Sequence, residues 1–212
     1  MTNRWRAMSA GAAAAVACVL LAGCGDAIYA GDAAVIGPST ITTQALADDV
    51  EEIQEVRGTY GQSEPMLVAS VLQRQIITEL IAQAAAREGV SVTQAEIDAA
   101  RQDAVASVGG EEALEQAFLD SNVAPSDIPG QIALSITVDA LSSRLAPDGP
   151  PEQQQGVLFG YVVSLAQELG VLVNPRFGTW QVEQLQVGPP PTDLASPPAD
   201  PADLSFLPQP QG

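Results

Sequence analysis

Histidine and lysine are missing from this chain of 212 residues, and the chain contains only two cysteines. Without histidine, lysine or a free thiol, it cannot assemble a Ser-His-Asp, Cys-His or Ser-Lys nucleophile. Zinc and similar metals also lose the nitrogen and sulfur ligands that they usually take in proteins. Because only carboxylate chemistry remains, we expect that the protein is not an enzyme and uses neither a cofactor nor a metal.

Acidic residues could still form a carboxylate site, and their densest cluster is Asp48, Asp49, Glu51 and Glu52. Neighbouring side chains on one helix project in different directions around its solvent-exposed side. We therefore expect these carboxylates to be hydrated rather than to bind a ligand. The chain has neither the loop spacing of an EF-hand nor a glycine-rich phosphate loop followed by lysine. The acidic cluster therefore leaves the expectation of a non-catalytic protein unchanged.

Positive charge is scarce, because 26 acidic residues outnumber eight basic ones, all of them arginine, and the net charge is −18 at pH 7. A surface this acidic repels nucleic acid and anionic lipid headgroups, so we expect neither as a partner. It favours basic or unfolded cationic segments of other proteins. The arginine-only, alanine-rich composition is typical of a high-GC bacterium, and we expect an actinobacterial source.

The first 24 residues have the pattern of an export signal. Arg4 and Arg6 precede an apolar run over residues 7–20, which is too short to span a membrane comfortably. The following Leu21-Ala22-Gly23-Cys24 resembles a bacterial lipobox, which implies removal of residues 1–23 and acylation of Cys24, with palmitate among the attached chains. We therefore expect a protein that is lipid-anchored at the extracytoplasmic face of the cell membrane. The alternative is an ordinary secretory signal cut near Ala30.

Removal of the signal changes the counts of cysteine and of charge. Cys18 leaves with the signal and Cys24 is lipidated, so no thiol remains for a disulfide and the fold must rest on its core. Loss of Arg4 and Arg6 leaves six arginines against 26 acidic residues, a net charge of −20.

Composition divides the rest of the chain into three parts. Residues 24–32 form a short tether, residues 33–187 a single domain, and residues 188–212 a tail with half of the 16 prolines. We expect this tail to be disordered or polyproline-like. Helical periodicity dominates the domain, so the expected fold class is mainly α, with a small two-to-three-stranded sheet formed by the first and last segments.

Apolar spacing and capping signals predict six helices in this domain. Ser63 is expected to cap the second helix, and Thr93 with Glu96 forms a capping box for the third. The last helix is apolar nearly all round, so we expect it to fill the centre of the domain. The predicted ranges are about 43–57, 63–88, 93–108, 111–122, 125–145 and 153–169.

Two further segments are predicted to be strands. Residues 33–41 are expected to form a strand pair that turns at Gly37-Pro38. Residues 171–182 are expected to form a strand that bends at Asn174-Pro175 and carries Phe177 and Trp180. We expect this closing strand to pair with Val35–Ile41, which would tie the last element of the domain to the first.

The order of these segments is similar to that of a known family. Val35-Ile36-Gly37-Pro38-Ser39-Thr40-Ile41-Thr42 resembles the V-x-G-x-x-I-T start of the SurA N-terminal domain family, shared with PrsA-type foldases. Gly89–Ile97 resembles the family's G-(I/V)-x-V-(T/S)-x-x-E-(I/V) segment, and Val173–Trp180 resembles the closing strand of actinobacterial lipoproteins of this type. The resemblance covers about residues 33–182 and implies a helical chaperone domain.

The resemblance also limits the expected activity. Relatives often carry a parvulin prolyl-isomerase module before the closing helix and strand, whereas only the short segment 146–155 occupies that place here. We therefore expect a holdase for unfolded or secreted polypeptides, without isomerase activity. Because a holdase needs exposed apolar surface, the candidate client-binding residues are Tyr60, Met66, Phe159 and Val163. The alternative is that these side chains pack inside the domain.

Two other functions stay open. A non-catalytic envelope scaffold or interaction lipoprotein would bind one partner through its proline-rich tail. A lipoprotein that binds a small ligand ranks lower, because one helical domain lacks the alternating strand-helix pattern of a two-lobed receptor. Met66 is the only methionine after signal cleavage, so the chain has no methionine-rich adaptable surface.

Overall fold

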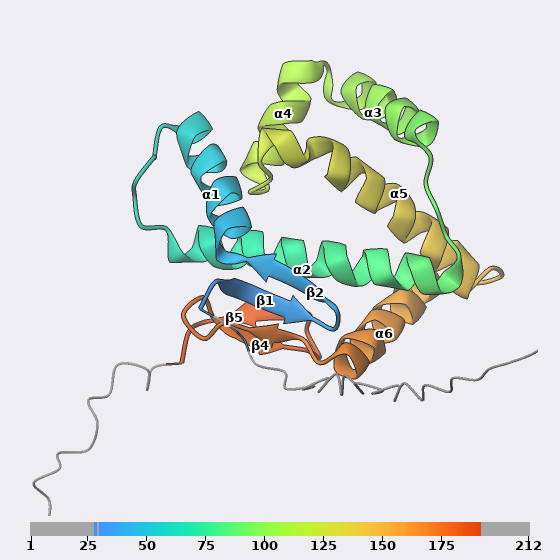
Figure 1. Ribbon diagram of the computed structural model, residues 1–212. Coiled ribbons are helices and arrows are strands. Elements are labelled where there is room, and N and C mark those ends of the chain that lie inside the picture. Colours follow the sequence, from blue (N-terminus) through green and yellow to red (C-terminus); the bar gives the residue numbers. More distant parts are fainter. Residues whose placement is uncertain (1–27, 29, 192–212) are drawn as a thin grey trace, which may run out of the picture.

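The computed structural model describes Ile28 and residues 30–191, which form a mainly helical domain with two small antiparallel sheets (Figure 1). The expected fold class, mainly α with a small sheet, is confirmed. The predicted signal over 1–23, the predicted lipidation residue Cys24 and tail residues 192–212 lie outside the described residues. No helix in the described part of the chain is both long enough and apolar enough to cross a membrane.

The six predicted helices are all present in the described chain, and a short 3₁₀ helix precedes the fifth. They are α1 (Thr43–Arg57), α2 (Pro65–Glu88), α3 (Gln94–Val108), α4 (Glu111–Asp120), η1 (Pro125–Asp127), α5 (Ile128–Leu145) and α6 (Pro151–Leu169).

Capping side chains set the starts of two helices. The Thr42 side chain accepts a hydrogen bond from Ala45 N at 3.1 Å and so caps α1. The predicted capping box of α3 is confirmed: Thr93 N donates to the Glu96 carboxylate at 2.7 Å, and Glu96 N donates to Thr93 Oγ1 at 3.4 Å. The prediction for α2 is wrong, because its cap position is Glu64 rather than Ser63 and makes no side-chain capping bond.

One sheet joins the two ends of the domain. Its order is β2-β1-β3, with β1 and β2 forming a hairpin that turns at Gly37-Pro38. Gly37 has φ 55°, which suits the first position of a two-residue hairpin turn of type II′. Closing residues Leu172 and Val173 pair antiparallel with Val35 and Ala34, so this part of the predicted pairing is confirmed. The strands are β1 (Asp32–Ile36), β2 (Ser39–Thr42) and β3 (Leu172–Val173).

The remainder of the closing segment forms a separate hairpin. Its strands are β4 (Thr179–Gln181) and β5 (Gln186–Gly188). Trp180 pairs with Val187 within this hairpin, and Phe177 belongs to neither sheet. The predicted pairing of Trp180 and Phe177 with Val35–Ile41 is therefore wrong. The physical reason is a tight turn after β3, in which Phe177 N donates to Asn174 O at 2.9 Å and redirects the chain.

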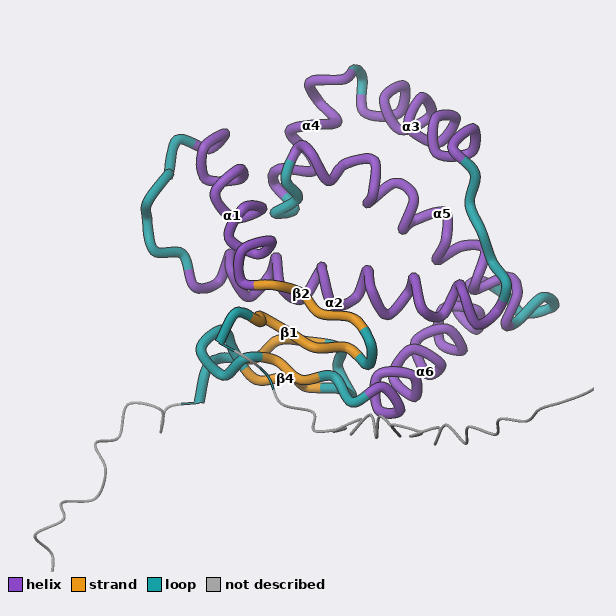
Figure 2. Tube along the Cα trace, in the orientation of Figure 1, coloured by secondary structure: helices purple, strands orange, loops and turns teal. Residues whose placement is uncertain are grey.

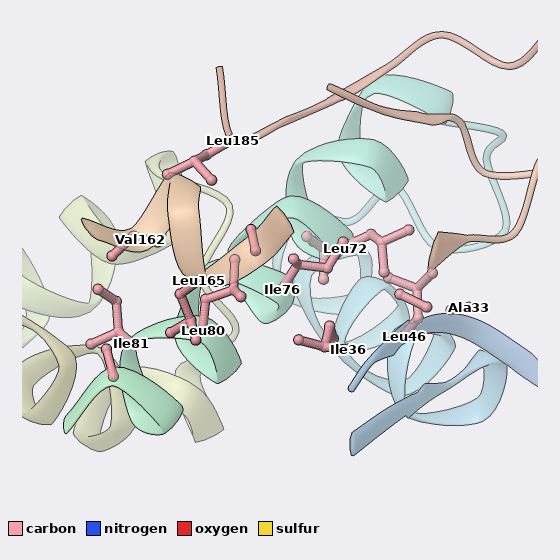
Figure 3. Close-up of a cluster of buried hydrophobic side chains, with 14 of the residues drawn as sticks. Ala33, Ile36, Leu46, Leu72, Ile76, Leu80, Ile81, Val162, Leu165 and Leu185 are labelled. Carbon is pink, nitrogen blue, oxygen red and sulfur yellow. The ribbon is translucent and has the colours of Figure 1, made fainter. Parts of the chain in front are cut away.

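Helix α2 is the centre of the core. It contacts α1, α5, α6, β1 and β5 (Figure 1). Figure 3 draws part of the buried cluster, in which Leu72 and Ile76 of α2 join Ile36 of β1, Leu46 of α1 and Leu165 of α6. The buried residues of α2 are Leu67, Val71, Leu72, Ile76, Leu80, Ile81, Ala84 and Ala85.

The expectation that the last helix fills the centre is therefore wrong. Helix α6 buries one face and leaves Val157 and Phe159 exposed on another. Helix α2 already lies between the sheets and the other helices. Helix α6 therefore packs at the side of the core, and some of its apolar residues stay exposed. The buried face of α6 consists of Leu158, Val162, Leu165 and Ala166.

A second, smaller cluster lies where α3, α4 and α5 meet. Val123, Ile128 and Ile132 are buried there, and Ile97 and Phe118 pack against them. In Figure 2, α3 and α4 lie above α5, away from the sheets. The site described next lies where α1 meets α2.

Candidate functional site

A groove of about 860 Å³ lies between α1, the first half of α2 and the end of the described chain. Side chains of α1 and α2 form two of its walls. Arg176, Phe177 and the segment Val187–Pro190 form the third wall. Ligand-binding pockets typically measure about 300–1,000 Å³, so this groove is large enough to hold a ligand.

The groove walls are mainly apolar. Leu46 and Val50 of α1 and Val68 of α2 belong to the core cluster or pack against it, and each also lines the groove. Phe177 and Val187 contribute apolar surface from the opposite wall. The groove is therefore an extension of the hydrophobic core that opens to solvent.

A buried glutamine forms hydrogen bonds to the loop at one end of the groove. Gln54 is 4% exposed, and its Nε2 donates to Gln62 O at 2.8 Å and to Glu64 Oε1 at 3.4 Å. These bonds fix the loop between α1 and α2, which lines the groove at residues 62–64. A buried amide needs such partners, so Gln54 and the loop stabilise each other.

The charged side chains of the groove are few. Glu51 of α1 and Glu64 before α2 line it, and Arg176 lies on the opposite wall. The Arg176 guanidinium carbon lies 4.7 Å from the centre of the Phe177 ring, a cation–π contact that holds the two side chains together. The groove thus combines apolar walls with two carboxylates and one cation.

Two of the four predicted client-binding residues lie near this groove. Met66 lines it and is 87% exposed, and Tyr60, in the loop between α1 and α2, is 67% exposed. Val56 at the end of α1 is also exposed. The alternative that Tyr60 and Met66 pack inside is therefore excluded.

The other two predicted residues lie elsewhere, on α6. Phe159 is 49% exposed and lines a second hollow of about 210 Å³ between α2, α5 and α6. Val163 is half-buried and packs against the core. The structure thus places the four predicted residues at two sites rather than one, and whether any of them contacts a client stays a prediction.

The second hollow is bounded on one side by the hairpin of β4 and β5. Leu185, in the turn of this hairpin, lines the hollow together with Ile77 and Ile81 of α2 and Leu158 of α6. Figure 3 shows Leu185 beside Val162 of α6. Both hollows are therefore bounded by the same C-terminal hairpin.

The chain was compared with known proteins. No protein-family model, no curated protein and no solved structure matches it. The resemblance to the SurA N-terminal domain family accordingly rests on the sequence motifs described above.

The acidic cluster in the middle of α1 does not simply face water. Asp49 Oδ2 accepts hydrogen bonds from Arg74 Nη2 at 3.2 Å and from Gln75 Nε2 at 2.8 Å. The Glu52 carboxylate accepts from both the backbone N and the Oγ of Ser126, at 2.9 and 2.5 Å. The expectation of a purely solvated face is wrong for these two residues, because α2 and η1 pack against this side of α1.

Arg74 lies between two carboxylates, because its Nη1 also donates to Asp127 Oδ2 at 2.7 Å. Burial raises the pKa of Asp49, and the nearby charge of Asp127 raises it further. This network joins α1, α2 and η1 and serves their packing. Within the residues that the structure describes, no group of three or more His, Cys, Asp or Glu side chains is placed to hold a metal ion.

Sequence reasoning missed the hairpin residues that bound both hollows. Gln73 of α2 accepts a hydrogen bond from Val187 N at 3.2 Å, and Leu185 lines the second hollow. The alternation in Gln184-Leu185-Gln186-Val187 is the signal that could have indicated this strand. The contact with Gln73 has no such signal, because it joins segments 114 residues apart.

Proposed function

We propose that this protein is a lipid-anchored, extracytoplasmic chaperone of the holdase type. It binds unfolded or exported polypeptides in the groove between α1 and α2 and catalyses no isomerisation. The observation that carries the proposal is the groove itself, an open and mainly apolar hollow of about 860 Å³. Apolar hollows of this size on a folded surface mark binding sites.

The side chains at the end of the groove support a polypeptide as the ligand. Val56, Tyr60 and Met66 are exposed within eleven consecutive residues, where α1 ends and α2 begins. Exposed apolar side chains that gather at one place are typical of surfaces that bind other proteins. An unfolded chain offers matching apolar side chains, and Met66 can adapt to several of them because its side chain is flexible.

The charge of the molecule supports a preference among clients. With a net charge of −18, the protein attracts basic polypeptides over a distance and repels acidic ones. Glu51 and Glu64 bring two of these carboxylates into the groove itself. Basic clients with interspersed apolar residues therefore fit both the walls and the charges of the groove.

Only the sequence supports the membrane-anchoring part of this proposal. The lipobox-like segment Leu21-Ala22-Gly23-Cys24 lies outside the described residues and supports acylation at Cys24. Anchoring at the outer face of the cell membrane would place the groove where exported chains emerge unfolded.

An aggregation assay tests the proposed function. The full chain, purified in detergent, should suppress aggregation of a reduced, basic model substrate at near-stoichiometric ratios and without ATP. Met66→Ser should weaken suppression, because it removes an apolar contact from the groove while leaving the core intact. Val108→Ser is the matched control, since Val108 is also exposed but lies at the end of α3, outside the groove lining.

Equal suppression by the two variants would contradict the assignment of the groove. If the wild-type protein suppresses the aggregation of no client that is tested, this result would contradict the chaperone function. The non-catalytic envelope scaffold would then take its place, and deletion of residues 192–212 should abolish binding of its partner.

A further inference from the structure

The chain enters its proline-rich tail along the wall of the groove. The first tail residues, 188–190, line the groove together with Val187, whose N donates to Gln73 Oε1 of α2 at 3.2 Å. Thr179 Oγ1 of β4 donates to Pro189 O at 3.3 Å, which fixes the chain in this position as it leaves the hairpin. The rest of the tail therefore starts beside the groove.

The tail contains one strongly apolar segment, residues 204–207, with the sequence Leu-Ser-Phe-Leu. It holds three of the tail's four large apolar side chains, and Phe206 is the only aromatic one. The fourth, Leu194, stands alone between aspartate and alanine. Since an apolar groove binds apolar side chains, residues 204–207 are the part of the tail that matches the groove walls.

This segment is within reach of the whole groove. Met66 and Gln73, which both line the groove, are about 10 Å apart along α2 at 1.5 Å per residue. Leu204 follows Pro191 by 13 residues, and a flexible linker of that length has an r.m.s. span of roughly 20 Å. A tether of this reach gives its ligand an effective concentration of about 1 mM or more. Even a ligand of weak affinity then occupies its site for much of the time.

Charge makes the tail a ligand that a basic client can replace. Arg176 is the only cation that lines the groove, and within the described residues its guanidinium pairs with no carboxylate. The tail has three aspartates and no basic residue, so Arg176 attracts it. Glu51 and Glu64 of the same groove repel it. A basic client gains at these two glutamates where the tail loses.

We propose that residues 204–207 of the chain's own tail occupy the groove between α1 and α2, and that a client binds by displacing them. The displacement rests on the proposed function, whereas the docking of the tail does not. Bound as an extended segment, Leu204 and Phe206 point to the same side, about 7 Å apart, and both face the apolar walls. The tail then covers apolar surface that would otherwise promote association between copies of the protein.

Methyl NMR of the full chain tests the docking without any client. The protein is placed in lipid nanodiscs, because free detergent would compete for an apolar groove. Met66 lines the groove, and its methyl resonance is identified by its loss in Met66→Leu. Phe206→Ser should shift this resonance, because the substitution removes an aromatic ring and an apolar contact from the groove.

Leu194→Ser is the matched control for this measurement. It removes a large apolar side chain from the same tail but outside residues 204–207, so the Met66 resonance should stay in place. A resonance that is unchanged in Phe206→Ser would overturn the proposal.

Dilution separates docking within one chain from docking between copies. With one copy in each nanodisc, the Met66 resonance of the wild type should keep its position when the protein is diluted about tenfold. Movement toward its position in Phe206→Ser would mean that the tail binds a second copy, which would overturn docking within the chain.

Fluorescence titration with a basic, apolar peptide tests the displacement. If residues 204–207 occupy the groove about 80% of the time, Phe206→Ser should bind the peptide about fivefold more tightly than the wild type, and Leu194→Ser should bind it equally well. Equal affinity of the wild type and Phe206→Ser would overturn the displacement. Weaker binding by Phe206→Ser would also overturn it and would favour the scaffold, in which the tail itself binds the partner.

The two measurements fail separately. If neither the wild type nor a variant binds the peptide, the proposed function fails, and the Met66 resonance still decides whether the tail occupies the groove. If the peptide binds but the Met66 resonance does not respond to Phe206→Ser, the inference fails alone.

Discussion

Arg74 shows at the scale of single residues how this domain uses its few cations. The guanidinium bridges Asp49 on α1 and Asp127 on η1, and it lies mostly buried between them. Because burial and the charge of Asp127 raise the pKa of Asp49, the folded state binds a proton at Asp49 more tightly than the unfolded state does. The contribution of Asp49 to the free energy of unfolding therefore falls as pH rises from 3.8 through its folded pKa.

Asp127→Asn should lower the pKa of Asp49 toward its ordinary value of 3.8. The substitution removes the neighbouring negative charge, whereas burial by α1 and α2 remains. Carboxyl NMR titration of the two proteins measures the shift. Glu168→Gln is the control, because Glu168 pairs with Arg87 at the other end of α2 and should leave Asp49 unchanged. An Asp49 pKa that stays raised by the same amount in Asp127→Asn would assign the whole effect to burial.

The elements of the domain are tied together by its last segment. Beyond the pairing of β3 with β1, Asn174 N donates to Ala33 O and Asn174 Nδ2 donates to Asp32 O, both at 2.9 Å. The following hairpin then covers α2 and buries Leu185. The first strand thus depends on residues more than 130 positions away.

A chain that ends at Gly170 should be less stable than one that ends at Pro191 by several kcal/mol, about the cost of deleting a large buried side chain or more. The shorter chain loses β3 and the hairpin, leaves one edge of β1 unpaired and uncovers part of α2. Urea denaturation of both chains measures the difference. Coincident unfolding curves would mean that the closing segment does not contribute to the fold.

At the scale of the whole molecule, the proposed function makes the acidic charge a determinant of which polypeptides bind. Exposed charges are screened over about 8 Å at physiological ionic strength, whereas burial of apolar surface is insensitive to this screening. Charge should therefore control the attraction of basic clients, and the apolar groove should control the part of the affinity that salt cannot remove.

A basic, apolar peptide should accordingly bind more weakly as ionic strength rises from about 0.01 M to about 1 M, yet retain measurable affinity. A peptide with glutamine at each basic position should bind with nearly constant affinity over the same range. Fluorescence titration of the two peptides measures both dependences. Complete loss of binding at high salt would show that the groove contributes no apolar contact.

The proposed anchoring can also be tested at the scale of the whole molecule. Cys24→Ser should release the protein from membranes, because it removes the proposed lipidation site and no described helix is long and apolar enough to cross a membrane. Fractionation of cells that express either protein measures the release. Cys18→Ser is the control and should stay anchored, since Cys18 belongs to the predicted signal that is removed. A Cys24→Ser protein that stays firmly bound after signal cleavage would contradict the lipoprotein hypothesis.

The sequence by itself determined those features of the fold that depend only on residues close together in the chain. The helices could be predicted because the spacing of Leu67, Val71 and the other apolar residues of α2, and the capping box at Thr93, are local signals. The hairpin turn at Gly37-Pro38 was predictable for the same reason. Composition also determined which chemistries this chain lacks, because residue types that are missing cannot be supplied by folding.

Tertiary structure alone decided which helix is central and where the closing segment goes. Both α2 and α6 carry wide apolar surfaces, yet α2 supplies more of the core cluster and α6 leaves Phe159 exposed. The positions of Leu185 and Gln73 likewise depend on contacts between distant segments. Such contacts are set by packing of the whole chain, so a local pattern indicates that a strand exists but not which surface it covers.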